Sequence, residues 1–143
     1  MHNLRNLVRR RELVAAPSPT TVLEAAVTMH DAGVGALCVI DDGELVGIFS
    51  ERDLMSRVVV PGRDPRRTRL ADVMTRDVVT ATLEETRREC LDRMREERFR
   101  HLPVLEDGQV VAMVSMRDLL RDEIAEQREE IVGLHAYLHS TPL

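Results

Sequence analysis

The stretch GIFSERDL at residues 47–54 returns 65 positions later as AMVSMRDL at residues 112–119. The same shift places Asp42-Gly43 on Asp107-Gly108, and the alignment needs no gap from residue 13 to residue 58. A fixed period sustained over such a length indicates a duplicated structural unit. The 143-residue chain is therefore predicted to contain two copies of one unit.

Each copy is predicted to run β-α-β-β-α. A short extended segment (12–16 and 77–81) precedes an amphipathic helix, and two apolar runs then flank the Asp-Gly turn. Asp-Gly between β-branched runs is a strong hairpin signal, because both turn positions tolerate positive φ. A second helix closes each copy, from residue 51 to about 59 and from residue 116 onward. Capping-box patterns predict the helix starts, with Thr21 and Glu24 in copy one and Thr82 and Glu85 in copy two.

The predicted fold class is mixed α/β (α+β), with two β-α-β-β-α repeats packed sheet to sheet around one shared core. One unit is too small to stand alone, so the pair is expected to have pseudo-two-fold symmetry. The boundaries are 8–60 for repeat one, 61–69 for a linker, 70–124 for repeat two and 125–143 for a C-terminal helix and tail. The last segment carries an apolar stripe that needs burial on its own pair or across a dimer, formed by Ile124, Ile131, Leu134 and Leu138.

Composition narrows the function classes. The formal net charge of −5 argues against nucleic acid as the main partner. Aromatic residues make up 2%, so a flat ligand would be held by aliphatic side chains and backbone. Cys38 and Cys90 lie in apolar surroundings without a CxxC motif and are expected to be buried, reduced thiols. No apolar run approaches the ~18 residues of a membrane span and no apolar signal core appears, so a cytoplasmic protein is expected.

Catalytic and metal motifs are absent from the sequence. It has no nucleophile–base pair, P-loop or GxGxxG, and we therefore do not expect an enzyme. His135 and His139 have the i, i+4 spacing of a chelating pair but no evident third ligand, so no metal site is predicted.

Residues 47–53 resemble the signature G-h-h-[ST]-x-x-D of CBS (cystathionine-β-synthase-type) domains, where h is apolar. Residues 112–118 match it except that Ala112 replaces Gly, and PTTVLEAA (19–26) and RHLPV (100–104) also resemble segments of these domains. The resemblance covers about residues 8 to 124. It implies a stand-alone, bacterial-type CBS pair (a Bateman module), disc-shaped, with two clefts that take the adenosine part of AMP, ADP, ATP, S-adenosylmethionine or NAD. Such pairs often form homodimers.

The resemblance places the ribose at Asp53 and Asp118, since a carboxylate at a helix start can accept from two adjacent hydroxyls. The alternative is an acidic residue favoured there by the helix dipole. Ser50 and Ser115 are predicted N-caps and, with the free N–H groups of the helix start, candidate anion contacts. Two further candidate cations begin the same helices, Arg52 and Arg117.

Phosphate requires cations, and only copy two supplies them before its hairpin. Arg100 and His101 stand where nucleotide-binding relatives place basic residues, whereas copy one has Gly35 and Ala36. The two clefts are therefore predicted to be unequal, with the second repeat holding phosphate more tightly. His101 is expected to be partly cationic near neutral pH; a neutral, hydrogen-bonded residue at the sheet edge is the alternative.

Adenine requires an apolar slot with backbone hydrogen bonds, and the strands are expected to provide two. One predicted slot is lined by Leu13, Val14, Ala15, Leu37 and Ile48. The other is lined by Val78, Val79, Thr80, Leu102, Pro103 and Met113. Ordinary core packing is the alternative for these residues.

The sequence thus predicts a sensor of adenine nucleotides, with AMP first and ADP, ATP or NAD(H) as alternatives. NAD(H) is included because the small residues of copy one could admit a longer ligand. Two other hypotheses stay open: a ligand-free scaffold for a partner enzyme or transporter, and a nucleic-acid binder that uses the linker arginines Arg63, Arg66, Arg67 and Arg69.

Overall fold

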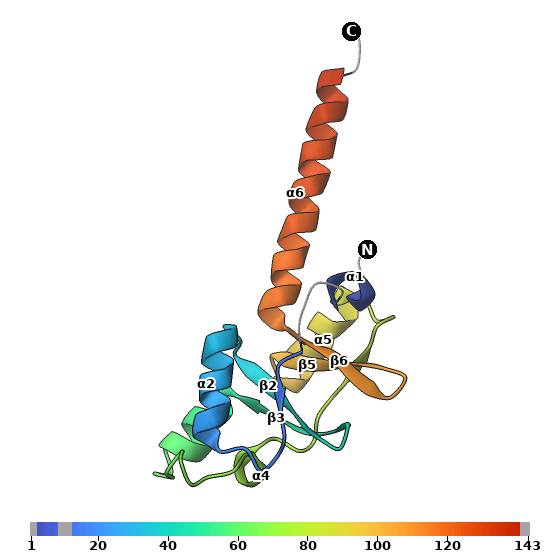
Figure 1. The fold of residues 1–143 in the computed structure, drawn as a ribbon. Coiled ribbons are helices and arrows are strands. Elements are labelled where there is room, and N and C mark those ends of the chain that lie inside the picture. Colours follow the sequence, from blue (N-terminus) through green and yellow to red (C-terminus); the bar gives the residue numbers. More distant parts are fainter. Residues whose placement is uncertain (1–2, 9–12, 141–143) are drawn as a thin grey trace.

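The computed structural model describes residues 3–8 and 13–140 and contains two three-stranded sheets, one in each repeat (Figure 1). The N-terminal half contains α1 (Leu4–Val8), β1 (Ala15–Ala16), α2 (Val22–Ala32), β2 (Ala36–Asp41), β3 (Glu44–Ser50), α3 (Glu51–Asp53) and the π-helix η1 (Leu54–Val59). The C-terminal half contains α4 (Leu70–Val73), β4 (Ala81–Thr82), α5 (Arg87–Glu97), β5 (His101–Glu106), β6 (Gln109–Ser115) and α6 (Met116–Ser140).

Both sheets have the same topology, which confirms the predicted β-α-β-β-α order. In each, a short parallel strand pairs with the first strand of an antiparallel hairpin. The register shifts at equivalent places, between Val39 and Ile40 and between Val104 and Leu105. Asp42 and Asp107 have φ values of 50° and 51°, as their Asp-Gly turns require. The duplication therefore extends to the irregular features of the backbone.

The helix caps correct one prediction. Thr21 caps α2 as expected, accepting a hydrogen bond from the Glu24 N–H at 3.2 Å. In copy two, however, the capping box is formed by Thr86 and Glu89, so the assignment to Thr82 and Glu85 is wrong. Residues 82–89 contain two successive Thr-x-x-Glu patterns, and the first lies in β4 and the turn that follows it. The 65-residue register, which pairs Thr21 with Thr86, identifies the correct one.

Buried apolar side chains form two clusters, one against each sheet, so the expectation of a single shared core is wrong. The cluster of the first sheet also contains Leu70, Val73 and Met74 from the start of the second repeat. Successive strand residues point to opposite faces of a sheet. Leu37 and Val39 consequently pack with the helices of their own repeat, while Cys38 points to the other repeat and approaches Met113 Sδ at 3.9 Å. Cys38 and Cys90 are buried free thiols, and burial raises their pKa values to about 12 and about 11.

The N-terminal helix α1 packs on the second repeat. Leu4 is fully buried in the second cluster, and the N–H groups of Leu4 and Arg5 donate to the carbonyls of Glu85 and Leu83. The sequence analysis assigned no element to these residues. The N-terminal helix thus contributes to the buried cluster of the second sheet.

The last helix, α6, is continuous across the boundary predicted at residue 124 and projects from the body of the molecule (Figure 1). Its first turns are held by Arg87 of α5, which contacts Asp122 at 2.8 Å and Glu126 at 2.6 Å. From residue 127 to residue 139 every side chain is exposed. No helix in the described part of the chain is long and apolar enough to cross a membrane.

Candidate functional site

Each hairpin ends in a Ser-x-x-Asp corner, and the two corners have the same local structure. The Asp53 N–H donates to Ser50 Oγ at 3.2 Å, and the Ser50 N–H donates to Asp53 Oδ2 at 3.0 Å. The corresponding distances between Asp118 and Ser115 are 3.1 and 2.9 Å. The predicted N-cap role of both serines thus matches the geometry. Because the local structure is alike, any difference between the corners comes from what surrounds them.

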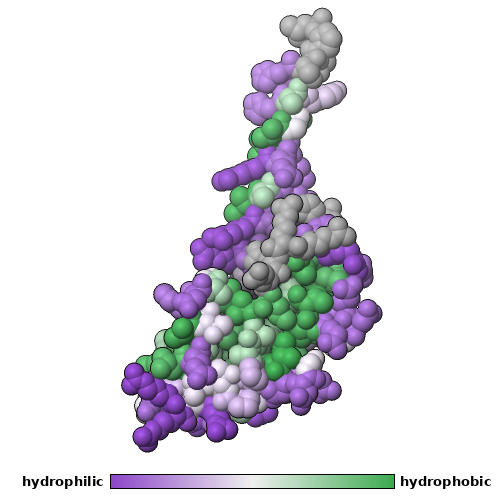
Figure 2. Space-filling model, viewed as in Figure 1, coloured by the Kyte–Doolittle hydropathy of each residue, from purple (hydrophilic) through white to green (hydrophobic). Residues whose placement is uncertain are grey.

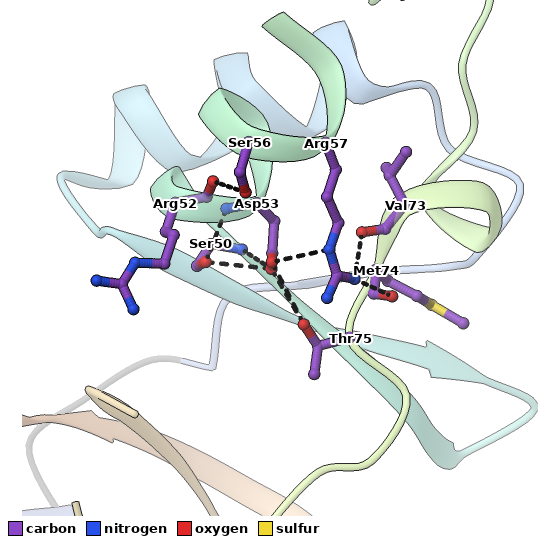
Figure 3. Close-up of polar contacts among 8 residues, drawn as sticks. All are labelled: Ser50, Arg52, Asp53, Ser56, Arg57, Val73, Met74 and Thr75. Carbon is purple, nitrogen blue, oxygen red and sulfur yellow. Dashed lines mark hydrogen bonds and ion pairs between the residues drawn. The ribbon is translucent and has the colours of Figure 1, made fainter. Parts of the chain in front are cut away.

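The first corner is enclosed (Figure 3). Asp53 is 7% exposed, and its carboxylate accepts a hydrogen bond from Thr75 Oγ1 at 3.3 Å. Arg57 approaches the same carboxylate at 3.7 Å and donates to the carbonyl oxygens of Val73 and Met74. Asp53 therefore joins the end of β3 to residues 73–75, at the start of the second repeat.

Backbone contacts complete this enclosure. Ile48 and Thr75 exchange two N–H···O hydrogen bonds of 2.9 Å each, which lays the Met74–Thr75 segment along β3. Gly47 allows the close approach, since a Cβ there would lie 2.8 Å from Met74 Sδ and from the Thr75 carbonyl oxygen. We call this segment the strap.

The second corner opens onto a cleft of about 1010 Å³ between the repeats. Ser115 and Asp118 lie in its wall, and the floor includes residues of the first repeat. Nine predicted site residues line it: Val14, Gly35, Ala36, Arg100, His101, Met113, Ser115, Arg117 and Asp118. Drug-sized and cofactor-sized ligands occupy sites of ~300–1,000 Å³, so the cleft is large enough for a nucleotide.

The other predicted site residues do not line this cleft. Leu37 and Leu102 are fully buried in the two cores, because strand alternation turns them toward their own helices. Ile48 is paired with the strap, and Val79 packs against the second core. Seven further predicted site residues lie elsewhere in the two repeats, outside the lining of this cleft: Ala15, Ser50, Arg52, Asp53, Val78, Thr80 and Pro103.

Several lining residues were missed by the sequence analysis. They come from the C-terminal end of α2 and the two residues after it, from the start of α3 and from the first turns of α6. For the α2 group the signal that could have indicated them is Gly33, whose φ of 67° ends that helix. These residues are Met29, His30, Ala32, Gly33, Val34, Glu51, Met116, Leu120, Arg121 and Ile124.

The charges in the cleft are mixed, with cations in excess. Three arginines, Arg100, Arg117 and Arg121, line it together with the carboxylates of Glu51 and Asp118. Oxygen-rich anions are bound well by arginine, which can donate two parallel hydrogen bonds. The wall also contains apolar side chains from each repeat, so the cleft combines an anion-binding part with an apolar part.

His101 lies at the contact between the repeats. A Cβ at Gly35 would lie 3.3 Å from Glu51 Oε2 and 3.4 Å from His101 Nε2, so the glycine leaves room for both side chains. Burial lowers the pKa of His101, and Glu51 and Asp118 oppose that effect only in part. Desolvation disfavours the charged imidazole, which favours the neutral alternative for His101 over the partly cationic one.

Metal chemistry has no evident place in the described residues, which contain no cluster of three or more His, Cys, Asp or Glu side chains that could hold an ion. His135 and His139 stack on each other, with ring centroids 5.6 Å apart.

Comparison with known proteins identifies the fold. The protein-family model of the CBS domain matches this sequence at residues 4–60 and 70–124. The mitochondrial CBS domain-containing protein CBSX3 of Arabidopsis thaliana is 37% identical over 123 residues, which cover 82% of this chain. The chain spans only 60% of the length of that relative.

Solved structures of CBS-domain proteins have the same fold as this chain. A putative signal-transduction protein with CBS domains from Burkholderia ambifaria is 31% identical with a TM-score of 0.83, and the match covers 87% of this chain and 96% of that one. A CBS domain protein from Pyrobaculum aerophilum, solved with AMP, has a TM-score of 0.74 over 81% of this chain and 88% of that one. At 23% identity this second likeness concerns the fold alone. The two matched segments, the paired sheets and these relatives together show that the chain belongs to the CBS domain family, as a tandem pair of repeats.

Proposed function

We propose that this chain is a non-catalytic regulatory module that binds one adenine nucleotide, AMP first, in the cleft at Ser115 and Asp118. The observation that supports it most strongly is a difference between the two corners within the described residues 3–8 and 13–140. Asp118 lines a large cleft with three arginines, whereas Asp53 is enclosed by Thr75, Arg57 and the strap. The proposal therefore has one nucleotide site, in place of the two that the family resemblance implied.

The cleft wall offers each group that a nucleotide requires. Asp118 can accept from ribose hydroxyls, and the arginines can bind phosphate. Val14 and Met113, one from each repeat, give apolar surface for a base in a chain that has almost no aromatic residues. ADP, ATP and NAD(H) contain the same adenosine group, and the small side chains at Gly35 and Ala36 leave room for a longer ligand.

Regulation would follow from the position of the cleft. Its walls come from both repeats, so a bound nucleotide would contact both and favour the arrangement that it fits best. A second copy of the chain or a partner protein would then bind preferentially to that arrangement of the repeats. An exposed apolar group on α2, η1 and the residue after it supports protein contact on the first repeat: Leu23, Val27, Met55, Val59 and Val60.

The test is calorimetric titration of the full chain with AMP, ADP, ATP, NAD⁺ and S-adenosylmethionine. We expect AMP to bind with a stoichiometry of one per chain. Asp118→Asn keeps an oxygen for the Ser115 N–H but removes the charge, and we expect it to weaken binding at least about tenfold, the equivalent of ~1.4 kcal/mol.

The matched control is Asp92→Asn, which removes a charge from the exposed face of α5 outside the cleft and should leave binding unchanged. A second nucleotide per chain would contradict the single-site proposal. If none of the five ligands binds, the nucleotide proposal fails, and a ligand-free scaffold that uses the apolar group on the first repeat becomes the better account.

A further inference from the structure

The projecting part of α6 carries an apolar stripe that is largely exposed in the single chain. Ile124, Ile131, Leu134 and Leu138 are 50–62% exposed. Figure 2 shows hydrophobic residues interspersed with hydrophilic ones along the projecting part of α6. A lone helix of this kind leaves apolar surface in water, which usually marks a contact with another protein.

The stripe follows a heptad repeat. If Ile124 is placed at position a, then Ile131 and Leu138 also fall at a, while Leu120, Gln127 and Leu134 fall at d. Isoleucine at a with leucine at d favours two-stranded coiled coils. We call the a and d positions together the seam; a single polar residue in it fixes the register of the two helices. From Leu120 to Leu138 the helix thus contains six successive seam positions, five of which are apolar; Arg117 occupies the a position before them.

The body of the protein holds α6 by its opposite face. Leu119 at position c is fully buried in the second core, and Asp122 at f and Glu126 at c contact Arg87. The a and d positions therefore face away from α5. The anchoring leaves the seam positions from Gln127 to Leu138 exposed and available to another helix.

The charges beside the seam select its orientation. Glu123 and Glu130 occupy g positions, and Arg128 and His135 occupy e positions. In a parallel pair each g residue lies beside the e residue of the next heptad on the partner helix, which places Glu123 beside Arg128 and Glu130 beside His135. In an antiparallel pair g meets g and e meets e, so that glutamate would face glutamate and arginine would face the histidine or arginine of the other helix.

We propose that α6 forms a parallel two-stranded coiled coil with α6 of a second copy of this chain. The pairing begins at the cleft, since Leu120 and Ile124 line both the seam and the cleft wall. A second copy would therefore stand beside the proposed nucleotide site. The coiled coil itself needs no nucleotide, and its evidence is independent of the function proposed above.

The first test introduces one cysteine into the full chain without nucleotide. Leu134→Cys places a thiol at a d position, where a parallel, in-register pair brings the two copies of one residue together. Mild oxidation should convert most of the protein to a disulfide-linked dimer. Cys38 and Cys90 are buried with raised pKa values, so they should not compete.

The control for this test is Glu129→Cys, at the outward f position of the same helix, which should remain monomeric on a non-reducing gel. Both sites are exposed in the single chain, so neither substitution should prevent folding. Equal cross-linking of the two variants, or none in Leu134→Cys, would overturn the proposal even if the chain dimerises through another face.

The second test exchanges charges. Glu123→Arg alone and Arg128→Glu alone each put like charges together in a parallel homodimer and should weaken self-association at low salt. Mixed, the two variants should pair with each other in excess of the half share that random pairing produces, because each charge then meets its opposite. A random distribution would overturn the parallel orientation. Loss of AMP binding in Asp118→Asn should leave both results unchanged, which separates this proposal from the nucleotide site.

Discussion

At the scale of single residues, Gly47 and Ala112 mark the difference between the two repeats. They occupy equivalent positions in the two motifs, 65 residues apart. Gly47 lies under the strap, where a Cβ would come within 2.8 Å of Met74 Sδ and of the Thr75 carbonyl oxygen. Ala112 is fully buried, and the segment equivalent to the strap at this corner, residues 9–10, lies outside the described residues. The absence of one methyl group thus allows the strap to enclose the first corner.

Gly47→Ala is accordingly expected to destabilise the protein. Overpacking of a buried site costs about 1–3 kcal/mol, and here one of the two clashing atoms belongs to the backbone, which yields less easily than a side chain. Urea unfolding should show a lower midpoint with an unchanged slope.

The control for this prediction is Gly133→Ala in α6. Nothing lies within 4 Å of the Cβ that it would add, and the residue lies inside a helix. Alanine should therefore stabilise by about 0.5–1 kcal/mol. Two substitutions of the same type would then have opposite signs, and a stabilising Gly47→Ala would show that the strap is not tight.

At the scale of elements, α6 depends on a small anchor. Its 25 residues extend over about 37 Å at 1.5 Å per residue, but only the first turns contact the body. Arg87 is the centre of that anchor, with a side chain 12% exposed between the carboxylates of Asp122 and Glu126. Burial lowers the pKa of Arg87, but its two carboxylate partners outweigh this, so the net direction is upward.

Arg87→Gln should therefore cost more than an ordinary surface substitution. It leaves two partly buried carboxylates on the same face of α6 without their cation. The expected loss is about 2 kcal/mol, below the 3–5 kcal/mol of a fully buried pair because the carboxylates keep some contact with water. Urea unfolding of the variant measures the loss. The neighbouring Arg88→Gln, on the exposed face of α5, should change stability by less than about 0.5 kcal/mol, and equal effects would exclude the anchor.

At the scale of the whole molecule, the contact between the repeats contains a titratable group. His101 begins β5 of the second repeat and lies across Gly35 from Glu51 of the first. Burial is the largest influence on its pKa and lowers it; Glu51, Asp118 and Asp53 act in the opposite direction, and Arg100 adds to the lowering. The folded protein thus keeps this imidazole neutral at a pH where the unfolded chain begins to protonate it.

The stability of the pair should consequently fall on mild acidification. The folded pKa lies below the unfolded value of about 6.5, so the contribution is complete above pH 6.5 and is lost as the pH falls toward the folded pKa. Urea unfolding at pH 7.5, 6.5 and 5.5 should show a shallower decline for His101→Gln than for the unchanged chain. His139→Gln, at an exposed position of α6, is the control and should follow the unchanged chain. Parallel curves for His101→Gln and the unchanged chain would contradict the assignment.

Features that depend on short spacings and on the repeat could be predicted from the sequence: the two β-α-β-β-α units, the Asp-Gly hairpins and the Ser-capped corners. Hydrogen bonds between residues three or four positions apart depend on the local residue pattern, so the same pattern gives the same local structure in both repeats. A second Thr-x-x-Glu pattern beside Thr86 was enough to misplace a cap where the repeat register was not applied.

Which corner faces the cleft depends on long-range packing and could not be predicted from the sequence. Asp53 and Asp118 have the same local motif, but Thr75 and the strap reach Asp53 from a segment about twenty residues further along the chain, and no local spacing encodes that contact. Three other features also depend on contacts between distant segments. They are the sheet face on which Leu37 and Leu102 lie, the packing of α1 on the second repeat, and the outward orientation of the α6 seam. Each depends on which distant surfaces exclude water together, and that is a property of the packed molecule.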